Sequence, residues 1–182
     1  MRNIGNAVDP ITVQSLTIDR LSDVYDIDMR EHGDILYRVV AGHVQADVKE
    51  WTRPPRTREA WNRHIEEWTQ ILQAGGHAWG AYDAQHRMVG IIVLRPRLTE
   101  EMAQLAALFV SRDYRRTGIA TRLTHRLIRT ARASGARRLY VSATPSRSAT
   151  GFYQSQGFGL VDTVHPELFA REPEDIHMVL EL

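Results

Sequence analysis

The sequence has no cysteine among its 182 residues. Disulfide bonds, thiolate metal ligands and cysteine nucleophiles are therefore excluded for this chain. It also lacks the glycine-rich motifs G-x-x-x-x-G-K-[ST] and G-x-G-x-x-G and a serine nucleophile elbow, which disfavours P-loop, dinucleotide-binding and serine-hydrolase domains. His64 and Glu67 are one helical turn apart, but no third ligand is grouped with them, so we expect no metal.

Long apolar runs are missing as well. No run approaches the ~20 residues that a membrane-spanning helix needs. The first ten residues, M-R-N-I-G-N-A-V-D-P, lack the apolar centre of a signal peptide. We therefore expect a cytoplasmic protein with no membrane partner, with residues 1–10 as a flexible tail and residues 11–182 as a single domain.

Charge is nearly balanced over the chain, with a net value of +1, but it is unevenly placed. Between residues 112 and 138 a single acid, Asp113, faces a series of arginines: Arg112, Arg115, Arg116, Arg122, Arg126, Arg129, Arg132, Arg137 and Arg138. A nucleic-acid-binding surface is one interpretation of this series. A solvated helix face is the better one, because Arg122, Arg126 and Arg129 recur at helical spacing opposite an apolar stripe. We expect no nucleic-acid partner, although the charge can steer a polyanionic ligand.

Periodicity and turn residues predict strands and helices in an interleaved order. The predicted strands cover residues 11–17, 77–82, 88–94, 105–110, 138–143 and 176–182. The predicted helices cover residues 22–30, 58–74, 117–134 and 146–156. This order predicts an α+β fold with a mixed central sheet flanked by helices.

The early part of the chain gives weaker signals. Ser22 is the expected N-cap of the first helix. Residues 34–48 alternate in the manner of a strand, but only weakly. Residues 51–56 are expected to form a loop, because adjacent prolines fit neither a helix nor a central strand.

The most informative stretch joins the strand at 105–110 to the helix at 117–134. The first turn of a helix presents unpaired backbone N–H groups and the positive end of the helix dipole. Gly118 lacks a Cβ and lets a ligand approach that backbone, while Arg115 and Arg116 add positive charge. The junction therefore predicts a phosphate or pyrophosphate site.

Two motifs at and beyond this junction resemble those of a known family. Arg115, Gly118 and Ala120 spell R-x-x-G-x-A, and Ser148 to Phe158 read S-A-T-G-F-Y-Q-S-Q-G-F. Together they resemble the acyl-CoA signature and the second motif of the GNAT superfamily of N-acetyltransferases. The resemblance covers residues 79–158.

The resemblance implies a GNAT-like three-layer fold in which acetyl-CoA lies between two splayed parallel strands, 105–110 and 138–143. It further implies a β-bulge that frees the backbone of the first strand for the pantetheine arm and the acetyl carbonyl, at Leu108, Phe109 and Val110. The pyrophosphate is expected at the start of the following helix, on Arg115, Arg116, Thr117, Gly118, Ile119, Ala120 and Thr121.

Tyr153 is the predicted catalytic residue. In the resembled family the tyrosine of this F-Y pair lies near the CoA sulfur, where its hydroxyl can donate a hydrogen bond to the departing thiolate. Ser146 takes the place of a frequent family asparagine, and we predict that it bonds the pantetheine or a water.

The general base cannot be identified from the sequence. Relatives often carry a carboxylate about two residues ahead of the L-F-V segment, where this chain has Ala106 and Ala107. Other candidates, each more commonly a surface or structural residue, are His64, Glu67, His77, Glu100, Glu101 and His177. A water relay would need no specific residue.

The predicted activity is transfer of an acetyl group from acetyl-CoA to a primary amine of a small molecule or peptide, by direct attack in a ternary complex. The alternative is a non-catalytic acyl-CoA-binding or regulatory module on the same fold. The acidic residues from Glu172 to Asp175 are compatible with a cationic acceptor, although a solvated loop is the commoner use of such a segment. A homodimer is compatible with the exposed edge strands of such a sheet.

Overall fold

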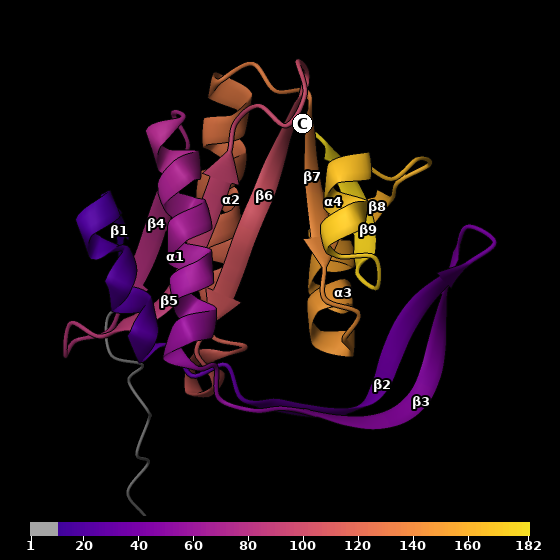
Figure 1. The fold of residues 1–182 in the computed structure, drawn as a ribbon, viewed down its shortest axis with the longest axis horizontal. Coiled ribbons are helices and arrows are strands. Elements are labelled where there is room, and N and C mark those ends of the chain that lie inside the picture. Colours follow the sequence, from indigo (N-terminus) through magenta and orange to yellow (C-terminus); the bar gives the residue numbers. More distant parts are fainter. Residues whose placement is uncertain (1–10) are drawn as a thin grey trace, which may run out of the picture.

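The computed structural model describes residues 11–182. The expected tail at residues 1–10 lies outside the described residues. A seven-stranded mixed sheet has the order β1-β4-β5-β6-β7-β9-β8, and a separate two-stranded sheet is made of β2 and β3 (Figure 1). In chain order the strands are β1 (Thr12–Ser15), β2 (Glu31–Val40), β3 (His43–Arg53), β4 (His77–Tyr82), β5 (Met88–Arg95), β6 (Met102–Val110), β7 (Arg138–Ala143), β8 (Gly159–Leu160) and β9 (Ile176–Glu181).

Helices cover both faces of the large sheet. They are the 3₁₀ helices η1 (Ile18–Asp26) and η2 (Arg112–Tyr114) and the α-helices α1 (Arg58–Gln73), α2 (Ile119–Ala133), α3 (Arg147–Ser155) and α4 (Pro166–Arg171). One face packs under α2 and α3, and the other under α1 and α4 (Figure 1). Alternate residues of β5 supply both cores: Ile92 and Leu94 pack with the α2 side, and Ile91 and Val93 with the α1 side.

The parallel strands β6 and β7 pair only at one end. Their pairing stops at Gln104↔Tyr140, after which β6 stays with β5 and β7 stays with β9. A β-bulge at Ala106, between the pairs Val93↔Ala107 and Leu94↔Leu105, accompanies the divergence, because an extra residue bends its strand. The predicted fold class, a mixed sheet flanked by helices with a splayed parallel pair, is confirmed.

The bulge expected in the first of the two parallel strands is present, and the residues that it was expected to free lie beyond it. Leu108, Phe109 and Val110 pair regularly with Ile92, Ile91 and Gly90 on β5. The edge of these residues that faces β7 lacks a strand partner because of the divergence, and the bulge lies nearer the paired end.

The first predicted helix is wrong in type, position and cap. Residues 18–26 form a 3₁₀ helix, and Ser22 lies inside it, preceded by Thr17 as the flanking residue. Leu21, Val24 and Ile27 are all buried, and their spacing of three matches the repeat of a 3₁₀ helix rather than that of an α-helix.

The expected loop at residues 51–56 is also partly wrong. Residues 51–53 end the long strand β3, and the adjacent Pro54 and Pro55 terminate it rather than preventing it. β2 and β3 form a hairpin that extends away from the rest of the fold and turns at Ala41 and Gly42, both with positive φ (Figure 1). The weak signal at residues 34–48 is explained by this arm, since few of its side chains reach a core that would impose a regular pattern.

Two elements had no clear sequence signal. These are the six-residue α4 and the two-residue β8, both too short for periodicity to reveal. Among residues 11–182, no helix combines the length and the apolar composition needed to cross a membrane.

Candidate functional site

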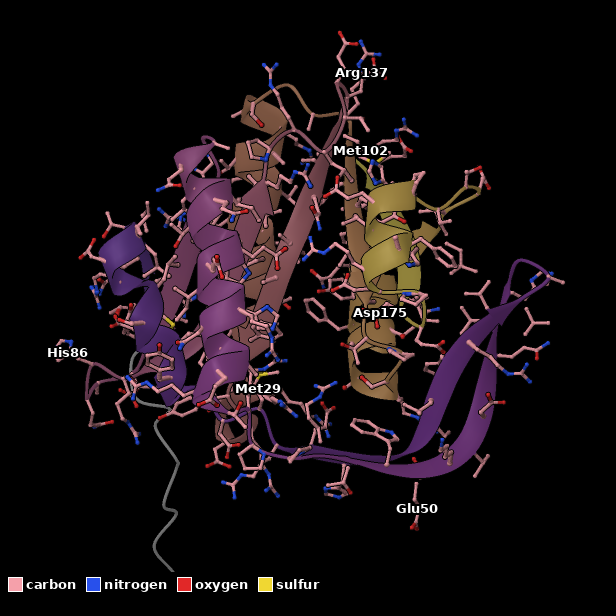
Figure 2. The ribbon with its side chains drawn as sticks, in the orientation of Figure 1. Met29, Glu50, His86, Met102, Arg137 and Asp175 are labelled. Carbon is pink, nitrogen blue, oxygen red and sulfur yellow. The ribbon has the colours of Figure 1, made fainter. Side chains whose placement is uncertain are left out.

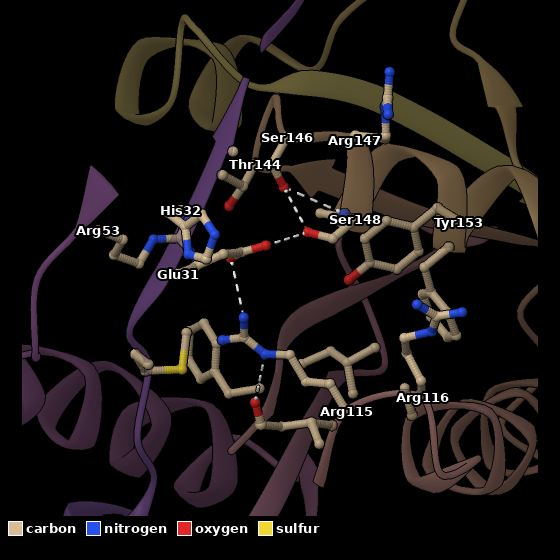
Figure 3. Close-up of a pocket in the computed structure, with 18 of the residues that line it drawn as sticks. Glu31, His32, Arg53, Arg115, Arg116, Thr144, Ser146, Arg147, Ser148 and Tyr153 are labelled. Atoms are coloured by element: carbon tan, nitrogen blue, oxygen red, sulfur yellow. Dashed lines mark hydrogen bonds and ion pairs between the residues drawn. The ribbon is translucent and has the colours of Figure 1, made fainter. Parts of the chain in front are cut away.

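A cavity of about 590 Å³ lies at the open end of the β6–β7 pair. Its lining comes from the end of β6, the start of α2, the start of α3 and the base of the β2–β3 hairpin (Figure 3). Eleven of the twelve residues predicted for the site line it: Leu108, Phe109, Val110, Arg115, Arg116, Gly118, Ile119, Ala120, Thr121, Ser146 and Tyr153. Thr117 is the exception; its hydroxyl donates to the carbonyl of Tyr114 at 2.6 Å.

The β6–α2 junction, residues 111–121, has the backbone geometry of an anion site. Gly118 precedes the helix with φ 85°, and Arg116 has φ 65°, so two residues of the turn are left-handed. The first backbone bond into the helix is from the Arg122 N–H to the Gly118 carbonyl. Within residues 11–182, no hydrogen bond is recorded from the backbone N–H groups of residues 116–121.

The space in front of this backbone is open. A Cβ placed on Gly118 would meet no other atom within 4 Å. Open space, unpaired N–H groups and the positive end of α2 suit a diphosphate group. The junction residues therefore fit the pyrophosphate of CoA.

Tyr153 lies on α3 and is 6% exposed. Its ring packs edge-on against Phe152 and Phe158, and its hydroxyl points toward the cavity (Figure 3). That hydroxyl has no recorded partner within residues 11–182. Burial, aided by the negative charge of Asp175, raises the pKa of Tyr153, so its phenol keeps its proton at neutral pH and can act as a hydrogen-bond donor.

Ser146 is the N-cap of α3. Its hydroxyl accepts from the Ala149 N–H at 3.3 Å and shares a hydrogen bond with the hydroxyl of Ser148 at 3.0 Å. The residue is 1% exposed. Ser146 therefore has a structural role at the cavity wall. Its oxygen keeps some hydrogen-bonding capacity, and its contact with a ligand remains a prediction.

Sequence reasoning missed the wall contributed by the β2–β3 hairpin. Glu31 is its central residue: one carboxylate oxygen lies 3.1 Å from Arg53 and 3.4 Å from Arg115, and the other accepts from Ser148 (Figure 3). Arg115 also donates through Nε to the Val110 carbonyl at 3.2 Å. Glu31 therefore connects the hairpin to the junction and to α3, and no local motif could have indicated it, because the partners are far apart in the chain.

Arg115 and Arg116 differ in their surroundings. Arg115 is half-buried and is held by Glu31 and the Val110 carbonyl, whereas Arg116 is exposed, lines the cavity and has no recorded ion-pair partner in the described residues. Arg116 is consequently the more available of the two for an anionic ligand.

The candidate bases named from the sequence are spread over the molecule, and within the described chain none of them lines the cavity. His64 pairs with Arg56, and burial together with nearby arginines lowers its pKa to about 4. His177 is buried between the Tyr140 hydroxyl and the Glu172 carbonyl. Glu67 and Glu101 pair with arginines, and His77 stacks on Trp79.

At the position where relatives often carry a carboxylate, Ala107 packs into the core on the α1 side and Ala106 forms the bulge. Over residues 11–182, no group of three or more histidines and acids is placed to hold a metal ion.

Comparison with known proteins agrees with this geometry. The acetyltransferase (GNAT) family profile matches residues 25–158. A nourseothricin acetyltransferase superposes with a TM-score of 0.72 at 16% identity, over 94% of this chain and 98% of that one. The PaiA N-acetyltransferase of Thermoplasma acidophilum, solved with coenzyme A, gives 0.59 at 15% identity over 95% and 99% of the two chains.

A chain of the NatC complex, solved with a Gag peptide and CoA, gives a TM-score of 0.59 at 16% identity, over 94% of this chain and 98% of that one. No curated protein sequence matches the chain. The profile match covers most of the chain, and the likeness in fold runs over nearly its whole length. The chain belongs to the GNAT acetyltransferase family.

Proposed function

We propose that this acetyltransferase moves an acetyl group from acetyl-CoA to a primary amine of a small molecule or peptide. The observation that carries the proposal is the gathering of eleven predicted site residues around one cavity at the open end of the splayed strands. The structural neighbours crystallised with coenzyme A support an acyl-CoA donor.

In this proposal the diphosphate of acetyl-CoA lies on the N–H groups at the start of α2, with Arg116 beside it. The pantetheine arm runs along the edge of Leu108 to Val110 that faces β7, where backbone groups have no strand partner. Recognition through the main chain explains why residues with apolar side chains can belong to a binding site, because each still carries a backbone donor and acceptor. The acetyl group then lies near Tyr153.

Chemistry proceeds by direct attack in the ternary complex. The neutral amine attacks the thioester carbonyl, the new C–N bond forms, and the C–S bond breaks with its electron pair going to sulfur. The Tyr153 hydroxyl donates a hydrogen bond to that sulfur as negative charge develops. Because burial raises the pKa of Tyr153, the tyrosine stabilises the thiolate as a donor and solvent supplies its final proton.

Two kinds of acceptor deserve a direct test, because the neighbours include a nourseothricin acetyltransferase and a complex solved with a peptide. The first is nourseothricin, and the second is a short peptide with a free N-terminus. Each is tested as a source of the amine that the proposal requires.

The experiment has two parts. Calorimetric titration with acetyl-CoA measures donor binding, and release of the CoA thiol in the presence of each acceptor measures transfer. Micromolar binding with acceptor-dependent thiol release supports the proposal. Binding without transfer to either acceptor favours the non-catalytic acyl-CoA-binding module, and absence of binding contradicts both.

A further inference from the structure

The turn between α4 and β9 places a carboxylate at the open end of the splayed strands. Ile176 pairs with Ala143, the last residue of β7, so Asp175 lies directly beyond that pair, where the cavity wall begins at Thr144. Figure 2 labels Asp175 at this turn. Asp175 is partly buried.

The first residues of β9 point to alternate faces of the sheet. Ile176 and Met178 pack into the core beneath α2 and α3. His177 points to the other side, toward Phe169 of α4. Asp175 lies in the bend directly before β9, at the point where the chain arrives from α4.

The charge of Asp175 acts on both sides of the cavity. It raises the pKa of Tyr153 on α3, and the positive charge of Arg53 on β3 acts in turn on Asp175. Tyr153 and Arg53 line the cavity, and Asp175 lies just outside this lining, opposite its residue Thr144. Glu172 is the other charged group acting on Asp175, while Glu67 of α1 is paired with Arg171 at 2.7 Å. Asp175 thus lies within electrostatic reach of the buried, unpartnered Tyr153 hydroxyl without an ion pair of its own in the described residues.

We propose that Asp175 is the general base of the transfer reaction, accepting the proton that the acceptor amine must lose, directly or through one water. This assignment rests on the acetyltransferase activity proposed above. The R–NH₃⁺ proton passes to the Asp175 carboxylate, and the resulting amine lone pair forms the C–N bond. The C–S electron pair leaves with sulfur beside Tyr153, and the Asp175 proton is then released to solvent.

The environment of Asp175 suits this role. Burial, with Glu172 adding to it and Arg53 opposing it, raises the pKa of Asp175 to about 7. A base with a pKa near the working pH combines a substantial ionised fraction with useful proton affinity. The carboxylate that Ala106 lacks is thereby supplied from the turn before β9.

The test compares Asp175→Asn with Glu174→Gln, which removes the charge of the exposed neighbouring acid. Thiol release from acetyl-CoA is followed over about four pH units centred near neutrality, with nourseothricin, with a free-amine peptide and with no acceptor. The last condition reports the slow attack of water, whose proton would also pass to Asp175.

We expect Asp175→Asn to lower kcat about 100-fold at neutral pH and to remove the rise in kcat/KM with a midpoint near 7. Asp175→Glu should restore part of the rate, Glu174→Gln should leave rate and profile unchanged, and acetyl-CoA should bind all of them with similar affinity by calorimetry. An effect on acetyl-CoA affinity alone, or an unchanged pH profile in Asp175→Asn, would overturn the assignment.

Failure of the base assignment and failure of the proposed function give different patterns. An active wild type whose rate and profile survive Asp175→Asn retains the function and removes Asp175 from it. A wild type that binds acetyl-CoA but consumes none, with either amine or with water, contradicts the function and the base together.

Discussion

The two ends of this site differ in how the chain builds them. The β6–α2 junction presents main-chain groups from one continuous stretch, residues 111–121. The opposite wall is made of side chains from the β2–β3 hairpin and the start of α3, which are far from each other in sequence, and the α4–β9 turn lies next to it. A site made of backbone needs a particular local conformation, while a site made of side chains needs the fold to bring distant residues together.

The largest effect is expected from a substitution that disrupts the β6–α2 junction. Gly118→Asp places a side chain and a negative charge where a Cβ now meets only open space, and forces a left-handed φ of 85° on a residue with a Cβ. We expect acetyl-CoA affinity to fall at least about 100-fold, measured by calorimetry, since anion and carboxylate would compete for the same N–H groups.

Gly135 offers a matched control. It ends α2 with φ 87°, and a Cβ there also meets nothing within 4 Å. Gly135→Asp therefore carries a similar backbone strain away from the cavity and should leave acetyl-CoA affinity unchanged. An equal loss in both variants would mean that strain, not the anion site, explains the effect.

This contrast also explains what could be predicted from the sequence. The junction was readable because Arg115, Gly118 and the following apolar stripe are close together in the chain and set a backbone conformation locally. Eleven of twelve predicted residues consequently line one cavity.

Glu31 and Asp175 were not readable as part of one site, because their relation depends on a hairpin with weak periodicity and on a turn after a six-residue helix. The seven-stranded sheet was predictable, apart from the two-residue β8, because its central strands are nearly continuous apolar runs bounded by turn residues. The η1 helix and the β2–β3 arm were not, because short or weakly buried elements leave little pattern.

The next largest effect concerns Tyr153, whose hydroxyl faces the cavity between the two ends of the site. Tyr153→Phe removes only the hydroxyl that faces the cavity, and we expect kcat to fall about 100-fold with acetyl-CoA affinity retained. Tyr114→Phe is the matched control, because Tyr114 also lines the cavity but its hydroxyl donates to Asp83 at 2.9 Å. Steady-state rates of thiol release distinguish them: similar losses of kcat in both variants would remove the special role of Tyr153.

A smaller effect separates the two arginines of the junction. Arg116→Met should weaken acetyl-CoA binding about tenfold at low salt and less at high salt, because the exposed guanidinium is screened by ions. Arg112→Met changes the charge equally on a residue outside the cavity lining and should change affinity little. Calorimetry at two salt concentrations provides the measurement, and equal effects would attribute steering to the whole arginine series.

The smallest expected effect concerns protein stability and the charge of Asp175. The pKa of Asp175 rises from 3.8 to about 7 on folding, so between these values the folded protein binds more protons than the unfolded chain, and stability falls as pH increases. Above about pH 7 the Asp175 carboxylate is ionised in the folded protein, and its partial burial then lowers the free energy of unfolding by its full amount. Asp175→Asn should therefore melt several degrees above wild type at pH 8, and this advantage should shrink through the acid range and vanish below 3.8.

Scanning calorimetry of Asp175→Asn and Glu174→Gln across this range gives the comparison without any acceptor. Glu174 is exposed, and its replacement should leave the melting temperature unchanged at each pH. If Asp175→Asn is more stable than wild type but has a lower kcat, the protein keeps the Asp175 charge at the expense of stability because the reaction uses it. Equal melting temperatures of wild type and Asp175→Asn at pH 8 would mean that the Asp175 carboxylate is well solvated. The two ends of the site would then differ only in whether their residues come from one stretch of the chain or from several.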